Sequence, residues 1–204
     1  MRRVVVLVLL ALALPIAAWA DGLNITNEFG SVSVLSSGVT STGSQLRSWG
    51  SFAPGTSLGM VNYATGALTS GSITAGGTFA GGGYFDVLGI GKWAKALVGC
   101  TACTNPIALF TGSFVGPVSW TLTGTGPLTY NLSGAIQGTY YDGRQITGST
   151  SQTIYSATGQ ISQGIGHIRM GTSNLNVPEP GTLGLLGTGL VGIAGIFRRK
   201  LIGS

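Results

Sequence analysis

The sequence predicts an all-β domain, an antiparallel β-sandwich or a jelly-roll-like fold, with an apolar helix before it and another after it. Apolar and polar residues alternate with a period of two in many segments, as expected for strands with one buried face. Gly and Pro turn signals separate these segments at intervals of roughly 8–12 residues. The 36 Gly, 20 Ser and 23 Thr make up 79 of the 204 residues, while 44% of residues are hydrophobic and only 7% are charged. This composition fits strands and turns better than helices or disorder.

The expected strands follow one another along the whole central part of the chain. They cover residues 23–27, 31–35, 46–52, 58–63, 67–73, 78–87, 107–114, 118–123, 128–141, 145–155 and 166–170. One short turn of helix is expected within residues 90–98. An outer-membrane barrel is an alternative because its strands also alternate. Several alternations here are short, however, and the chain ends in a basic, helix-like segment. No fixed repeat supports a β-helix.

The clearest pair of strands is a hairpin formed by residues 128–141 and 145–155. An Asp-Gly turn signal lies between the two strands. A two-residue loop would place Ile146 on the polar face of the first strand, because a slip of one residue exchanges the two faces. A three-residue loop of residues 142–144 places Ile146 opposite Tyr140 on the apolar face. We therefore expect the three-residue loop, accompanied by a bulge.

The N-terminal segment has the three parts of a secretory signal peptide. Arg2 and Arg3 give it a positive start, residues 4–14 are continuously apolar, and Pro15 ends the helix. A helix of these 11 residues spans only about 16 Å, which is too short to cross a bilayer. Small residues then form a cleavage site, so the mature chain should begin at Asp21. The residues expected at this site are Ala18, Ala20 and Asp21.

The only two cysteines, Cys100 and Cys103, lie close together in a segment rich in Thr, Asn and Pro. Export would place them in an oxidising compartment. A zinc site needs a second pair of ligands, and a redox-active pair normally opens a helix of a βαβ unit. Neither pattern is present. We expect a structural disulfide or an unbonded pair, and no metal site.

Few residues between the two terminal segments could catalyse a reaction. The acidic residues are Glu28, Asp86 and Asp142, and the only histidine is His167. Asp142 is accounted for by the turn, and His167 lies in an alternating strand. No G-x-S-x-G motif occurs, and the glycine-rich residues 75–85 lack the Lys-Ser/Thr of a phosphate-binding loop. We expect neither an enzyme nor a bound cofactor.

Two further patterns limit the binding functions. The formal charge of +5 comes mainly from the chain ends, so the sequence does not predict the basic surface of a nucleic-acid-binding protein. Trp49, Trp93 and Trp120 are candidates for stacking on sugars, but aromatic residues commonly fill the core of a sandwich. We therefore expect these three tryptophans in the core.

The C-terminal segment joins three features in a fixed order. Pro178, Glu179 and Pro180 come first, and residues 181–197 then form an uncharged stretch that ends at a basic cluster. As a helix, these 17 residues span about 25 Å, the short end of the range for a bilayer. We expect a transmembrane helix over residues 181–197. The stop-transfer residues, expected to stay cytoplasmic, are Arg198, Arg199 and Lys200.

This order of features resembles the PEP-CTERM sorting domain. The resemblance covers about the last 27 residues and assigns Pro178, Glu179 and Pro180 as the recognition motif. It implies an exported protein of a Gram-negative bacterium that makes exopolysaccharide. It also implies transient processing by exosortase, an inner-membrane protease-transpeptidase. The partners it implies are exosortase, the bilayer and, outside the cell, polysaccharide.

The sequence therefore predicts three parts: a signal peptide over residues 1–20, a Gly/Ser/Thr-rich β-domain over 21–176 and a sorting and anchor segment over 177–204. The function we expect is that of an exported protein, anchored transiently in the inner membrane. It is then sorted to the cell surface or the exopolysaccharide matrix of a biofilm. There the β-domain would have a structural or adhesive, non-catalytic role. The alternatives are a carbohydrate-binding module and a surface protein held permanently by a single span.

Overall fold

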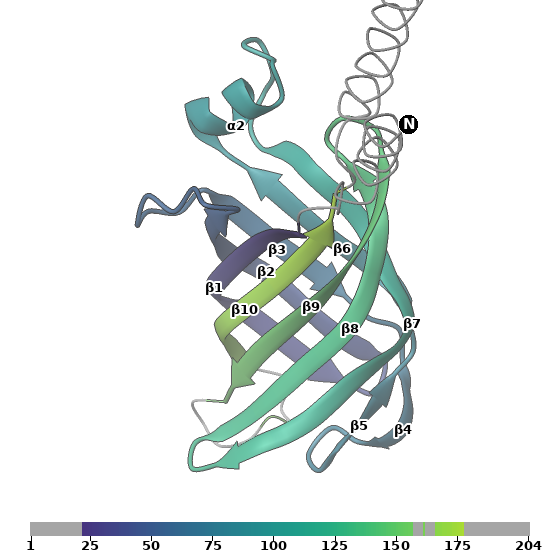
Figure 1. The fold of residues 1–204 in the computed structure, drawn as a ribbon. Helices are drawn as coiled ribbons and strands as arrows, with labels where there is room; N and C mark the ends of the chain where they lie inside the picture. Colours follow the sequence, from purple (N-terminus) through teal and green to yellow (C-terminus); the bar gives the residue numbers. More distant parts are fainter. Residues whose placement is uncertain (1–21, 157–160, 162–165, 178–204) are drawn as a thin grey trace, which may run out of the picture. The chain divides into compact units, whose positions relative to one another are not determined.

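The computed structural model describes residues 22–156, 161 and 166–177. Within these residues, eight strands form a closed antiparallel barrel (Figure 1). Their order around the barrel is β7-β6-β3-β2-β1-β10-β9-β8, and β8 pairs back with β7. The strands are β1 Gly22–Leu35, β2 Gly38–Trp49, β3 Gly59–Ala64, β6 Gly82–Gly89, β7 Ile107–Thr125, β8 Leu128–Tyr140, β9 Gln145–Tyr155 and β10 Gly166–Asn176.

Two smaller elements lie at opposite ends of the barrel (Figure 1). Strands β4 (Leu68–Ser72) and β5 (Gly76–Phe79) form a hairpin that pairs with the second half of β7. The helix α2 (Gly91–Leu97) lies at the other end. The all-β class is confirmed, but the expected sandwich is wrong, because a single sheet closes on itself. The two expected flanking helices, within residues 1–20 and 181–197, lie outside the described residues.

Long bent strands allow this sheet to close. The expected strands 23–27 and 31–35 are one strand, β1, with register shifts on both sides of Phe29. The backbone bends there through Phe29 (φ 62°) and Gly30 (φ 82°). The expected strands 107–114 and 118–123 are likewise one strand, β7, with a shift between Val115 and Ser119. Bulges of this kind increase bending and twist, which a small closed barrel requires.

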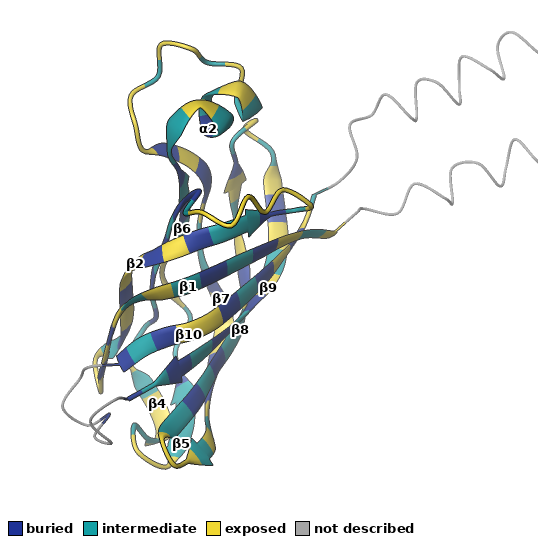
Figure 2. Cartoon of the chain, turned by 90° about the vertical axis from the view of Figure 1, so that its left-hand side faces the viewer, coloured by how far each residue is buried: buried dark blue, intermediate teal, exposed yellow. Residues whose placement is uncertain are grey.

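The barrel has an apolar interior and a polar exterior. Inward-facing residues such as Ile25, Val61, Phe85 and Leu132 are fully buried, and buried residues alternate with more exposed ones along the strands (Figure 2). The outward-facing positions of β8, β9 and β10 are mostly Ser, Thr, Asn and Gln. An outer-membrane barrel would carry an apolar band on this outward face. A layer of polar residues interrupts the interior of the described barrel, and Ser41 is buried there as well; the layer consists of Asn27, Ser44, Thr150, Gln152 and Ser173.

The β8–β9 hairpin confirms the expected faces and corrects the expected register. Ile146 and Tyr140 are both buried in the barrel, but Ile146 lies opposite Gly138 instead of Tyr140. The loop has three residues, as expected, but they are residues 141–143. Gly143 is its last residue and adopts a φ of 88°. A three-residue hairpin loop places its left-handed residue last, so glycine fixes the loop one position earlier than expected.

Aromatic side chains fill both ends of the barrel. At the end nearer β4 and β5, Trp120 stacks on Tyr130 with ring centroids 4.5 Å apart. The Trp120 Nε1 donates a hydrogen bond to the Ile73 carbonyl at 2.9 Å, and the Tyr130 hydroxyl donates one to the Thr74 carbonyl at 2.8 Å. These bonds hold the β4–β5 loop over the barrel. At the end near α2, Trp49 stacks on Tyr140.

Candidate functional site

A hollow of about 430 Å³ lies in the outer face of the sheet formed by β8, β9, β10 and β1. Strand pairing places its polar side chains in two rows. In the first row, Thr26 pairs with Thr172, Thr172 with Ser151, and Ser151 with Ser133. In the second row, Asn24 pairs with Asn174 and Asn174 with Ser149. The hollow is lined by Asn24, Ser133, Gly134, Ser149, Thr150, Ser151, Thr172, Ser173 and Asn174.

The first row of hydroxyls continues beyond the hollow on both sides. Ser48 on β2 pairs with Thr26, and Ser119 on β7 pairs with Ser133. Six neighbouring strands therefore each contribute one Ser or Thr to a single band across the barrel. Some of these groups bond to each other or to a neighbour: Thr26 Oγ1 and Ser48 Oγ are 2.7 Å apart, and Asn131 Nδ2 donates to Ser151 Oγ at 2.9 Å.

The acidic residues of the barrel lie on different elements. Glu28 on β1 forms an ion pair with Arg47 at 3.2 Å, and Asp142 in the β8–β9 loop forms one with Arg144 at 2.6 Å. The hydrogen bond from Arg144 lowers the pKa of Asp142. Asp86 on β6 is different. Burial raises its pKa, and its Oδ1 atom has no hydrogen-bond partner among the described residues.

His167 lies on β10, where its Nδ1 donates a hydrogen bond to the carbonyl oxygen of Gly30 at 3.1 Å. Its ring contacts Tyr155. Within residues 22–156, 161 and 166–177, no group of three or more His, Cys, Asp or Glu side chains could hold a metal ion.

The three tryptophans differ in exposure. Trp120 is 1% exposed and Trp49 is 7% exposed, so both belong to the core. Trp93 on α2 is half-buried, and its Nε1 donates to the Leu58 carbonyl at 3.0 Å. The ring of Phe52, which is 46% exposed, lies 5.8 Å from that of Trp93. Neither core tryptophan offers a free face for stacking on a sugar.

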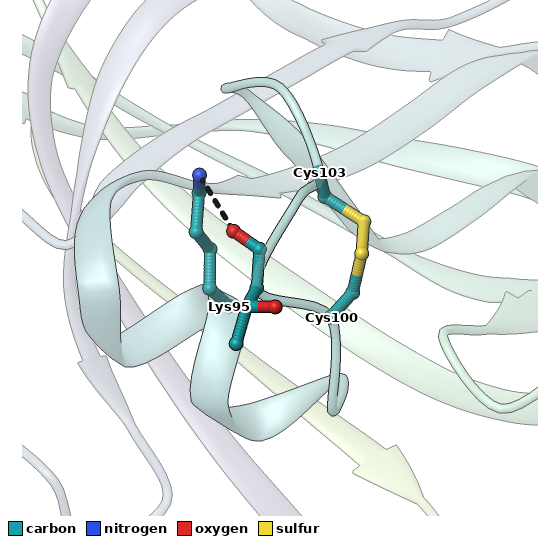
Figure 3. The surroundings of a disulfide bond; sticks show 4 residues. Lys95, Cys100 and Cys103 are labelled. Atoms are coloured by element: carbon teal, nitrogen blue, oxygen red, sulfur yellow. Dashed lines mark hydrogen bonds between the residues drawn. A yellow bond between two sulfur atoms is a disulfide. The ribbon is translucent and has the colours of Figure 1, made fainter.

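Cys100 and Cys103 form a disulfide in the loop after α2 (Figure 3). Lys95 lies beside it. Its carbonyl oxygen accepts a hydrogen bond from the Cys100 backbone nitrogen at 2.9 Å, and its Nζ donates to the Thr101 carbonyl at 3.3 Å. The disulfide therefore closes a small loop that these hydrogen bonds already connect to the C-terminal end of α2.

The first and last strands of the barrel meet where the two terminal segments join it. Gly22, the first residue of β1, pairs with Asn176, the last residue of β10. The next pair joins Leu23 to Leu175, whose side chain is fully buried. Only Val177 separates this strand pair from the Pro-Glu-Pro sequence.

Residues 176–200 match the family model of the PEP-CTERM protein-sorting motif. The chain therefore carries a PEP-CTERM motif. This motif indicates an exported protein that is sorted to the cell envelope or surface and is consistent with an exosortase substrate. No curated protein and no solved structure matches the chain. The motif begins at the residue that ends β10.

Several expected site residues lie outside the described residues. They are the cleavage residues Ala18, Ala20 and Asp21, the motif residues Pro178, Glu179 and Pro180, and the stop-transfer residues Arg198, Arg199 and Lys200. Among the described residues, no helix is long and apolar enough to cross a membrane.

The sequence contains a signal for the outer hollow. Each strand that lines it alternates inward residues with Ser, Thr or Asn, a pattern that is equally typical of any strand with one face toward water. Only the strand order shows that these residues lie side by side, because neighbours in the band can be far apart in the sequence. Thr26 and Thr172, for example, are paired.

Proposed function

We propose that this chain is an exosortase-sorted, exported protein whose barrel is a structural and adhesive component of the cell surface or of the extracellular polysaccharide matrix. The observation that carries the proposal is the PEP-CTERM motif at residues 176–200, which follows directly on the last strand of the barrel. In this proposal the barrel is the part of the protein that reaches the surface or the matrix, and the motif is the signal that sorts it there.

The arrangement of the polar residues supports a non-catalytic role for the barrel. Nucleophilic catalysis usually relies on a nucleophile within hydrogen-bond reach of an activating base. Among the described residues, Glu28 and Asp142 each bond to an arginine, and His167 bonds to a backbone carbonyl. The Oδ1 atom of Asp86 has no hydrogen-bond partner among them. A protein that only has to be stable and to present a surface needs no nucleophile and activating base.

A closed barrel with a polar surface that carries few charges also suits a matrix component. Closure pairs the strand edges that could otherwise template aggregation. A surface rich in Ser, Thr and Asn can exchange hydrogen bonds with hydrated polymers without repelling charged neighbours. The partners in this proposal are exosortase during processing, the bilayer through residues 181–197 before processing, and polysaccharide after it.

The proposal is tested by replacing Pro178, Glu179 and Pro180 with alanine in the full chain and locating the protein by cell fractionation. We expect the natural chain at the surface or in the matrix, shortened near the motif. The variant should remain in the inner membrane with Arg198, Arg199 and Lys200 intact, as read by mass spectrometry of its C-terminus. The control variant is Gln137→Ala on the barrel exterior, which should be sorted as the natural chain is.

Two results would contradict the proposal. An unchanged location of the alanine variant would show that the motif does not direct sorting. Surface protein that retains Arg198, Arg199 and Lys200 would instead identify residues 181–197 as a permanent single-pass anchor.

A further inference from the structure

We propose that the hollow between Asn24, Ser133, Ser149 and Asn174 is a binding site for a segment of a neutral oligosaccharide. This inference deepens the proposed function and rests on it, because it names the surface through which the barrel would contact a polymer. The hollow has about 430 Å³, which lies within the usual range for ligand sites.

The charge distribution selects a neutral ligand. The strand segments around the hollow, residues 22–27, 128–140, 145–155 and 171–176, contain no Asp, Glu, Lys or Arg. Recognition of an acidic ligand, such as a uronic acid polymer or a phosphate, normally uses arginine or lysine. The outward-facing side chains at the hollow are those of Ser, Thr and Asn, so no large apolar side chain is available there to bind an apolar ligand.

Unpaired hydrogen-bonding groups in the hollow match the chemistry of sugar hydroxyls. The side chains of Asn24, Ser149 and Asn174 are exposed and make no hydrogen bond to another described residue. Each amide supplies donors and an acceptor, and each hydroxyl can do either. A sugar ring also presents hydroxyls that both donate and accept. By contrast, the nearby Thr26 and Ser48 hydroxyls already bond to each other.

The two rows give the site a direction. Strands in a sheet are about 4.8 Å apart, and outward residues of one strand are about 6.6 Å apart. The first row and the second row thus run across the strands as two parallel lines of hydrogen-bond donors and acceptors. An extended chain of sugars can lie between them and contact several strands at once. A monomeric polyol would use only part of such a line.

The site has no aromatic platform, so binding to a short oligosaccharide should be weak. Each hydrogen bond to the ligand replaces one to water and adds little net affinity. A polymer offers many equivalent segments, and repeated weak contacts then give a strong overall attachment to a matrix. Weak single sites suit a surface component better than a transport protein.

The test is an NMR titration of the exported protein, purified as the cell processes it. The probes are neutral hexasaccharides of glucose, xylose, mannose and galactose, a hexamer of galacturonic acid, and sorbitol as a monomeric polyol. We expect at least one neutral hexasaccharide to shift backbone amides of β8, β9 and β10 around the hollow. The galacturonic acid hexamer and sorbitol should shift them much less.

A pair of double variants separates the hollow from the rest of the surface. The double variant Ser149→Ala with Asn174→Ala should lower the association constant for the neutral hexasaccharide by about fivefold or more. This is the effect of losing one or two hydrogen bonds. The matched control, Ser113→Ala with Gln137→Ala, removes a hydroxyl and an amide from a paired outward position away from the hollow. It should leave binding unchanged, and both variants should unfold at the denaturant concentration of the natural chain.

Four results would overturn the inference: no shift with any neutral hexasaccharide, equal or stronger binding of the acidic hexamer, equal binding of sorbitol, or equal effects of the two double variants. Sorting is measured separately by fractionation. A sorted protein without glycan binding refutes only the role of the hollow, and glycan binding by a protein that is not sorted refutes only the proposed function.

Discussion

Asn27 and Gln152 form a hydrogen-bonded pair inside the barrel, over the intervening strand β10, although 125 positions separate them in the chain. The Asn27 Nδ2 donates to Gln152 Oε1 at 2.9 Å and to Ser44 Oγ at 2.7 Å. The Gln152 Nε2 donates to Thr150 Oγ1 at 2.8 Å, and that hydroxyl lies 2.8 Å from Ser173 Oγ. Buried polar groups are costly unless they are bonded, so this network fixes the register of β1, β10 and β9.

The pair meets across β10 because Gly171 lies between its two members. A side chain at position 171 would contact both Gln152 Oε1 and Asn27 Oδ1. We expect Gly171→Ala to lower the free energy of unfolding by about 1–3 kcal/mol, the usual cost of overpacking a core. Urea unfolding followed by fluorescence measures it. The control is Gly124→Ala on β7, where an added Cβ would make only ordinary contacts. Equal effects of the two substitutions would show that Gly171 is not needed for the network.

Buried polar residues also explain which parts of two strands could not be predicted from the sequence. The strand expected at 46–52 actually begins at Gly38, and the strand expected at 166–170 continues to Asn176. In the missed parts the inward residues include Ser41, Ser44 and Ser173. These small polar residues remove the apolar alternation on which the strand predictions depended.

The closure of the sheet into a barrel also could not be predicted from the sequence. Alternation gives each strand one buried face, and both a sandwich and a barrel satisfy that condition. What decides between them is long-range pairing, such as Gly22 with Asn176. The hairpin at residues 128–155 was easier to predict, because the local turn residues and the parity of the loop length determine which side chains face the core. The position of Gly143 then set the register, which parity alone could not.

Asp86 and Asp142 should change stability with pH in opposite directions. Burial raises the pKa of Asp86 in the folded state. As the pH rises from the ordinary pKa of 3.8 through the folded value, the unfolded chain loses its proton first, so the barrel loses stability. We expect Asp86→Asn to be more stable than the natural chain at pH 7 and to lose this advantage below pH 3.8.

Asp142 is the matched comparison, because its pKa is lowered by the hydrogen bond from Arg144. Its stabilising effect is present above the ordinary pKa of 3.8 and is lost as the pH falls through the lower folded value. Asp142→Asn should therefore be less stable than the natural chain at pH 7. Urea midpoints measured across this pH range give both profiles. Two variants that shift in the same direction would contradict the assignment.

Trp120 and Trp93 should differ in their effect on stability. Trp120 is almost fully buried, stacks on Tyr130 and bonds to the β4–β5 loop. We expect Trp120→Ala to cost about 3–5 kcal/mol, as for other buried aromatic residues. Trp93→Ala should cost clearly less, because that side chain is only half-buried. Denaturant unfolding of both variants measures the difference in the free energy of unfolding. Equal losses of stability would contradict the assignment of Trp120 as a core residue that matters more for stability than Trp93.

The spacing between the barrel and the sorting motif should limit how fast the chain is processed. Asn176 is held in the strand pair with Gly22, and Leu175 is buried beside it. Only Val177 then precedes Pro178, whereas a protease generally needs several extended residues in its active site. Under the proposed function, a folded barrel this close to the motif restricts access to it. We expect a flexible Gly-Ser insertion after Val177 to speed processing by exosortase. The same insertion in the loop between β8 and β9 serves as the control, and pulse-chase labelling followed by electrophoresis measures both rates. A rate that is unchanged or lower after the Val177 insertion would show that the strand pair does not limit access.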